Sequence, residues 1–165
     1  MAYNGIRFGQ GINVFPVQPP KDVGGLTTDT LDVDIRDANW VTFLVNLGNL
    51  TSDATDTITL TVEATTDGAT TGDAVAFWYR LSSASATNTW GDVTAGTSDG
   101  VAIVGAAAGD NMSVLLDVDP AVVRNSVTGA VGVYVNSVTV GPIALMSTTA
   151  FVEHKYPGNT MSSTY

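Results

Sequence analysis

The most restrictive feature of this sequence is a strict alternation of hydrophobic and polar residues. Between residues 57 and 63, Ile58, Leu60 and Val62 alternate with threonines and end at Glu63. Successive side chains of a strand point to opposite faces of a sheet, so this period of two predicts a strand with one buried face and one wet face. The same pattern recurs at 31–35 and 131–135, which indicates that sheets dominate the fold.

Strand signals continue along the chain and are separated by short turn segments. We expect about eight to ten strands, because turn signals recur every 8–12 residues or so, the spacing typical of sandwiches and barrels. The expected strands are 31–35, 40–47, 57–63, 74–81, 101–104, 112–118, 131–135, 138–140 and 143–152. One helical turn is expected at 120–125, where Asp119 is a candidate N-cap and Pro120 takes the first helical position. The predicted fold is all-β, an antiparallel β-sandwich or jelly roll.

The hydrophobic face of each expected strand predicts the core. Its members are Leu31, Val33, Ile35, Phe43, Val45, Ile58, Leu60, Val62, Phe77, Tyr79, Val114, Leu116, Val133 and Val135. Residues 40–47 are almost wholly apolar, so we expect this strand to be covered on both faces or to lie at a subunit contact.

Composition divides the chain into one expected domain and two expected arms. Residues 1–29 are rich in glycine and proline, and within them only 12–15 are typical of a short strand, which Pro16 is expected to stop. The β-sandwich domain is expected at 30–155, followed by a C-terminal tail at 156–165. The start of the chain lacks the pattern of a signal peptide, and no apolar run approaches the roughly 18 residues of a membrane helix.

The charge composition argues against two classes of partner. The formal net charge is −10, and the 6 basic residues are scattered. Binding to a nucleic-acid backbone requires clustered cations, so we expect no nucleic-acid partner, and no membrane partner either. Charged residues make up only 13% of the chain, against roughly 25% in ordinary soluble proteins. A threonine-rich surface of low charge loses little on desolvation, which fits contacts with neighbouring proteins. A threonine-rich secreted sandwich has the same composition.

Few residues offer catalytic chemistry. The single histidine, His154, lies between charged neighbours, and we interpret it as solvated or hydrogen bonded. Residues 96–100 match Gly-x-Ser-x-Gly around Ser98, but a nucleophile elbow needs a strand before it and a helix after it. Here a polar loop precedes and a short strand follows, so we interpret the motif as a turn. The chain has no cysteine, and we predict no catalytic residue, no enzymatic activity, no cofactor and no essential metal.

Two pairs of carboxylates keep a calcium site open as an alternative. Asp32 and Asp34 share one face of an expected strand, and Asp117 and Asp119 share another. Each pair offers the oxygen ligands that a hard cation prefers. An ordinary wet face explains the first pair equally well.

The tryptophans divide into two groups. Trp40 and Trp78 lie inside apolar runs, so we expect them to pack in the core or at an interface. Trp90 lies in polar loop sequence, and it is the tryptophan that we consider for a ligand such as a sugar.

Several segments of residues 30–165 resemble a known class of structural protein. They are Ala76-Phe77-Trp78-Tyr79-Arg80, Trp90-Gly91-Asp92, Gly100-Val101-Ala102-Ile103, Ser113-Val114-Leu115-Leu116-Asp117-Val118-Asp119-Pro120 and the ending from Phe151 to Thr160. In style and order they are similar to the capsid decoration, or cement, proteins of tailed bacteriophages. The resemblance implies a β-sandwich or jelly roll that assembles, often as a trimer, on the exterior of a mature capsid. It implies the major capsid protein and other copies of the chain as partners, a location in the virion after synthesis in the host cytoplasm, and no catalytic residues.

The arms supply the expected contact residues. Tyr3, Phe8, Phe15 and Tyr156 are isolated aromatics in the arms, and together with Trp40 they are our candidate interface residues. An arm that folds back over its own sandwich is the alternative. For the whole protein the alternative function is a carbohydrate-binding β-sandwich module, which presents aromatic platforms to sugars.

Overall fold

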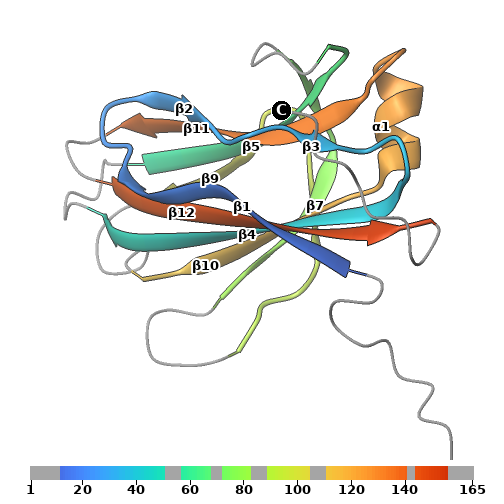
Figure 1. The fold of residues 1–165 in the computed structure, drawn as a ribbon. Coiled ribbons are helices and arrows are strands. Elements are labelled where there is room, and N and C mark those ends of the chain that lie inside the picture. The colour runs from blue at the N-terminus through green and yellow to red at the C-terminus, as the bar shows by residue number, and fades with distance from the viewer. Residues whose placement is uncertain are drawn as a thin grey trace, which may run out of the picture.

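The computed structural model describes residues 12–50, 57–67, 72–82, 89–104, 111–140 and 144–155. Within these ranges the chain forms twelve strands and one short helix (Figure 1). The strands are β1 (Ile12–Asp22), β2 (Thr27–Asp29), β3 (Val33–Asp34), β4 (Ala38–Leu50), β5 (Thr57–Thr65), β6 (Asp73–Val75), β7 (Phe77–Leu81), β8 (Thr94–Gly96), β9 (Val101–Val104), β10 (Ser113–Val118), β11 (Gly132–Val140) and β12 (Ala144–His154). The helix α1 spans Pro120–Ser126, and no described helix is long and apolar enough to cross a membrane.

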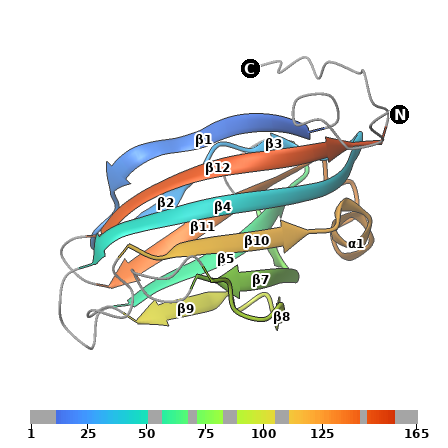
Figure 2. The ribbon, with the colours of Figure 1, turned by 90° about the horizontal axis from the view of Figure 1, so that it is seen from below.

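The strands form two antiparallel sheets that pack face to face, which confirms the predicted all-β sandwich. The large sheet has the order β1-β12-β4-β10-β7-β8 and is nearest the viewer in Figure 2. The small sheet has the order β2-β11-β5-β6, with β3 also paired to β11 and β9 also paired to β5. The small sheet is therefore four strands wide, with two short strands placed end to end along each of its edges.

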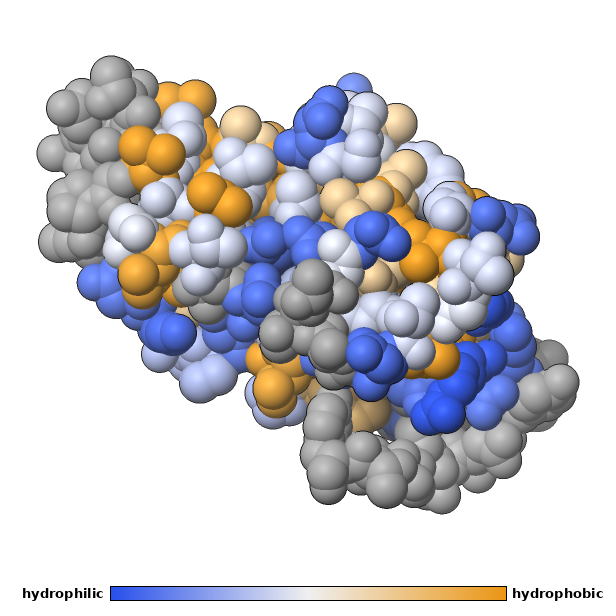
Figure 3. Space-filling view, turned by 90° about the horizontal axis from the view of Figure 1, so that it is seen from above, coloured by the Kyte–Doolittle hydropathy of each residue, from blue (hydrophilic) through white to orange (hydrophobic). Residues whose placement is uncertain are grey.

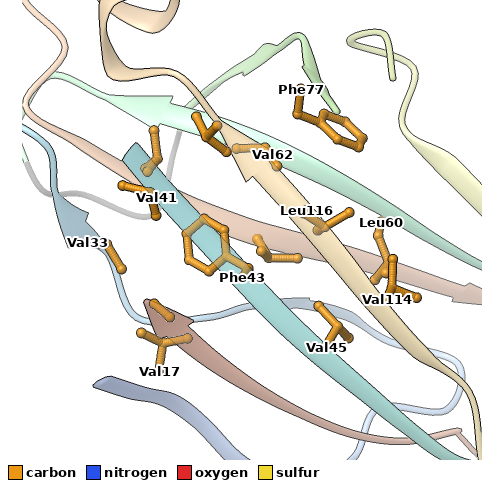
Figure 4. Close-up of a cluster of buried hydrophobic side chains, with 14 of the residues drawn as sticks. Val17, Val33, Val41, Phe43, Val45, Leu60, Val62, Phe77, Val114 and Leu116 are labelled. Atoms are coloured by element: carbon orange, nitrogen blue, oxygen red, sulfur yellow. The ribbon is translucent and has the colours of Figure 1, made fainter. Parts of the chain in front are cut away.

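The core lies between the sheets and is built from alternate residues of each strand. Val41, Phe43 and Val45 of β4 point into the same layer as Leu60 and Val62 of β5 (Figure 4), and each is at most 1% exposed. Twelve of the fourteen predicted core residues are buried; the other two are Tyr79, which is half-buried and packs against the core, and Leu31.

The prediction for Leu31 is wrong, since its side chain is 57% exposed. The strand that we expected at 31–35 is limited to β3. Thr30 still donates its amide to Val135 of β11, but Leu31 donates to the carbonyl of Val17 in β1 (3.0 Å). The chain leaves the β11 ladder at this point, so the alternation that starts at Val33 does not extend back to Leu31.

The N-terminal segment also differs from its prediction. β1 does not stop at Pro16 but continues to Asp22, with register shifts on either side of Gln18. Among the described strands it pairs with β12 alone, as an edge strand, and an edge tolerates proline because most amides on its outer side need no partner strand. Residues 12–22 and 27–29 therefore belong to the sheets rather than to an arm, whereas residues 1–11 and 156–165 lie outside the described residues.

Three further segments compare the expected elements with the observed ones. The expected strand at 74–81 divides at Ala76 into β6 of the small sheet and β7 of the large sheet. The expected segments at 131–135 and 138–140 form the single strand β11. The expected helical turn is confirmed as α1: Asp119 is its N-cap, and the carboxylate accepts from the amide of Ala121 (2.8 Å).

Candidate interaction surfaces

At one end of the small sheet, the described strands present uncharged side chains to solvent. The register aligns Val140, Thr57 and Val104 in one row and Val138, Thr59 and Ala102 in the next. We call these six residues the Val/Thr patch. Val140 is 58% exposed, Val104 is 50% exposed and Val138 is 44% exposed. In Figure 3, which views this face, hydrophobic side chains gather toward the left, the side on which β11 ends in Figure 1.

The remainder of the same face is polar and acidic. The Glu63 carboxylate accepts hydrogen bonds from the Tyr134 hydroxyl, from Nδ2 of Asn136 (2.7 Å) and from the Thr61 hydroxyl (3.4 Å). Tyr134 belongs to an outward row, yet it is only 1% exposed. A Cβ on Gly72 would lie 3.1 Å from its ring, so the closeness of the Gly72 backbone explains part of this cover.

Burial and charge shift the pKa of groups in this half of the face. Burial and the hydrogen bond to Glu63 raise the pKa of Tyr134 far above its ordinary value, so the phenol remains a donor. Partial burial, followed by repulsion from Glu63, raises the pKa of Asp29. Burial also raises the pKa of Asp32, although the Thr65 hydroxyl donates to its Oδ2 (3.0 Å). Among the described residues, the small sheet thus has one end without charged side chains and one acidic end.

The outer face of the large sheet carries an aromatic pair. Trp40 of β4 and Trp78 of β7 have ring centroids 5.9 Å apart and an interplanar angle of 19°. Asp117 of β10 lies in the same row as Thr42 and Trp78. Its Oδ1 accepts from the Thr42 hydroxyl (2.5 Å) and from Nε1 of Trp40 (3.4 Å).

The structure places two of the five candidate interface residues. Trp40 is half-buried on the outer face of the large sheet, whereas Phe15 is half-buried on the inner side and packs against the core. Tyr3, Phe8 and Tyr156 lie outside the described residues. Alternation could have revealed the outward position of Trp40, because Val41 and Phe43 point inward.

The two carboxylate pairs do not act as pairs. Asp34 accepts from Nε of Arg36 (3.0 Å) and forms an ion pair with it. Partial burial alone would raise the pKa of Asp34, but the hydrogen bonds and charge of Arg36 outweigh it and lower the pKa. Asp32, the other member of this pair, packs over Gly132. In the second pair, Asp119 caps α1, whereas Asp117 accepts from Thr42 and Trp40. No group of three His, Cys, Asp or Glu residues within the described ranges could hold a metal ion.

The remaining candidates have structural positions. His154 is 7% exposed, and its Nε2 lies 2.7 Å from Nδ2 of Asn13, which joins the ends of β12 and β1. Ser98 lies in a turn between β8 and β9, closed by the bond from the Gly100 amide to the Thr97 carbonyl (3.0 Å), so the turn interpretation is confirmed. Trp90 is 41% exposed and bridges to Ser82 beyond the end of β7.

No family model and no curated protein matches the chain. Among solved structures, it is similar to the crystal structure of the SPBc2 prophage-derived protein YomS, with 12% sequence identity and a TM-score of 0.39 over 86% of this chain and 91% of that chain. A similarity at this level assigns neither a family nor a function.

Proposed function

We propose that the chain is a virion structural protein of the capsid decoration or cement type, which docks on the outside of a bacteriophage head. The observation that carries the proposal is the Val/Thr patch. Its three valines are 44–58% exposed and its six residues include no ionisable group, although the chain has a net charge of −10. A contiguous exposed apolar surface with a polar border is typical of a protein interaction site.

The residue types of the patch suit a repeated, rigid contact. Valine and threonine are stiff at χ1, so little side-chain freedom is lost when a partner covers them. The threonine hydroxyls can donate to or accept from a partner without the cost of burying a charge. The acidic end, with Asp29, Asp32 and Glu63, lies on the same face and would set the orientation of docking by attraction to basic groups.

The proposed partners are the major capsid protein and further copies of the chain in the same shell, on the exterior of the virion. The segment resemblance to decoration proteins supports this assignment, and so does the low content of charged residues, 13%. The assignment needs no reactive centre, because a cement function requires area and shape. A lattice of weak contacts gains strength from avidity.

The test is cosedimentation of the purified chain with heads assembled from the major capsid protein encoded in the same genome. We expect the wild-type chain to pellet with the heads. The variant Val140→Asp places an unpaired carboxylate in the contact, and we expect its affinity to fall at least tenfold. Val93→Asp is the matched control, since Val93 is 51% exposed and lies outside the patch.

Two results would contradict the proposal: a wild-type chain that does not pellet with the heads, or Val140→Asp and Val93→Asp variants that bind equally well. The contribution of the N-terminal segment needs a separate deletion. Removing residues 2–20 would delete most of β1, so the deletion is confined to residues 2–11. If this segment carries contacts, the shortened chain keeps its melting temperature but binds heads more weakly.

A further inference from the structure

We propose that Trp40, Trp78 and Asp117 form a binding site for a neutral pyranose unit of a glycan. The site lies on the outer face of the large sheet, on the opposite side of the sandwich from the Val/Thr patch. It is independent of the proposed capsid function, because a different sheet carries it.

The two indole rings form an exposed aromatic surface. A centroid distance of 5.9 Å and an angle of 19° describe parallel, offset rings. Each ring packs in part against the other, and part of each side chain stays exposed to solvent and so within reach of a ligand. Trp78 is 36% exposed and Trp40 is half-buried. Since the rings come from β4 and β7, on the two sides of β10, the sheet framework sets their spacing.

Asp117 adds a hydrogen-bond acceptor beside the rings. Its position on β10, between the two tryptophan strands, is set by the register with Thr42 and Trp78. The bonds from Thr42 and Trp40 both reach Oδ1. Within the described part of the chain, Oδ2 accepts no hydrogen bond. The carboxylate is therefore held by one oxygen and presents the other.

A pyranose matches these two features together. One side of the sugar ring is a surface of C–H groups, which packs on an indole face, and its rim carries hydroxyls, which donate to a carboxylate. Few convergent polar groups beside an apolar surface are typical of small-ligand sites. The carboxylate at the rings favours a neutral sugar over an acidic one. Arg80 is exposed one row away, paired with Leu115, where it can donate to a hydroxyl of a second sugar unit.

A protein partner on this face is the competing occupant. A protein surface would bury the open oxygen of Asp117, and a buried carboxylate without a donor is costly. A protein could offset this cost only with a donor at that point, whereas every sugar carries several hydroxyl donors. The carboxylate beside the rings therefore favours the glycan.

The experiment measures sugar binding by the isolated chain, without capsids. Saturation-transfer NMR is recorded with lactose, maltose, cellobiose and the acidic sugar sialyllactose, and a wider glycan array follows. We expect at least one neutral sugar to bind. Affinity for that sugar should fall at least tenfold in Trp78→Ala and in Asp117→Asn. The control is Trp90→Ala, which removes a tryptophan that is 41% exposed but lies beyond the end of β7, and it should bind as the wild type does.

Folding is monitored in each variant by its thermal unfolding transition. Asp117→Asn keeps an oxygen that can accept from Thr42, so it tests the site even if Trp78→Ala unfolds. The inference is overturned if no neutral sugar binds, if only sialyllactose binds, or if Asp117→Asn binds as tightly as the wild type and the Trp90→Ala control. If no sugar binds and Trp78→Ala loses head binding, the face is a protein interface instead. Head binding through the Val/Thr patch can succeed or fail separately, in the cosedimentation assay.

Discussion

The hydrogen bond from Tyr134 to Glu63 allows the sharpest test of what stabilises the small sheet. Tyr134 faces outward from β11, yet it is 1% exposed, and its hydroxyl donates to Oε2 of Glu63 on the neighbouring strand β5. The other carboxylate oxygen is already occupied by Asn136 (2.7 Å). The variant Tyr134→Phe removes only the hydroxyl and leaves Oε2 beside a phenyl edge.

The expected loss follows from the charge of the acceptor. A hydrogen bond to a charged group contributes about 1.5–3 kcal/mol, roughly twice the value for neutral partners. Water has little access to replace it, because the Tyr134 ring is covered. We therefore expect Tyr134→Phe to lower the free energy of unfolding by about 2 kcal/mol. For a chain of 165 residues, this corresponds to a melting temperature lower by about 4–8 °C.

The assay is reversible urea unfolding at pH 7, with Tyr79→Phe as the matched control. Tyr79 is half-buried, and its hydroxyl donates no hydrogen bond within the described ranges, so we expect a change below about 0.5 kcal/mol. A double-mutant cycle with Glu63→Gln assigns the loss to the pair. If Tyr134→Phe unfolds within about 0.5 kcal/mol of the wild type, or if it costs as much in the Glu63→Gln background, the reasoning is refuted.

Three further substitutions test other contacts of the fold. Folding raises the pKa of Asp29 above its ordinary value of 3.8, so the folded state loses stability as pH rises and Asp29 ionises. Asp29→Asn should therefore raise the melting temperature at pH 7, and this gain should vanish below about pH 3.8. Gly132→Ala should lower the melting temperature, because the new Cβ would lie 2.1 Å from Oδ2 of Asp32. Asp119→Ala removes the α1 N-cap and should cost about 1 kcal/mol in urea unfolding.

Local sequence patterns were sufficient to predict which strand faces form the core between the two sheets. The alternation of Ile58, Leu60 and Val62 with threonines specifies which face of β5 is buried, and the same rule holds for β4 and β10. Proline and aspartate signals specified the N-cap of α1 at Asp119 and its first residue at Pro120. These features depend on near neighbours in the chain, so the sequence contains them directly.

The surfaces were harder to predict because they depend on the pairing of distant strands. Val133 and Val135 point inward, and continuing this phase along one strand places Ser137 and Thr139 inward and Val138 outward. When 131–135 and 138–140 are interpreted as two strands, the alternation is not continued from one to the other. The outward position of Val138, and with it the Val/Thr patch, is then not predicted. The closeness of Trp40 to Trp78 depends on the register of β4, β10 and β7, which no local pattern contains.

The edges of the large sheet explain why faces rather than edges should make the contacts of this protein. Among the described strands β1 pairs with β12 alone, apart from the bond of the Leu31 amide to the Val17 carbonyl, and its residues Pro16, Pro19 and Pro20 have no amide to donate. The opposite edge strand, β8, has only three residues. Proline and short length are the devices by which natural sheets prevent another strand from pairing with an edge. An incoming protein or glycan therefore meets two broad faces of different chemistry. The uncharged Val/Thr patch suits a rigid protein surface, and the tryptophan pair beside the carboxylate of Asp117 suits a ligand rich in hydroxyl groups.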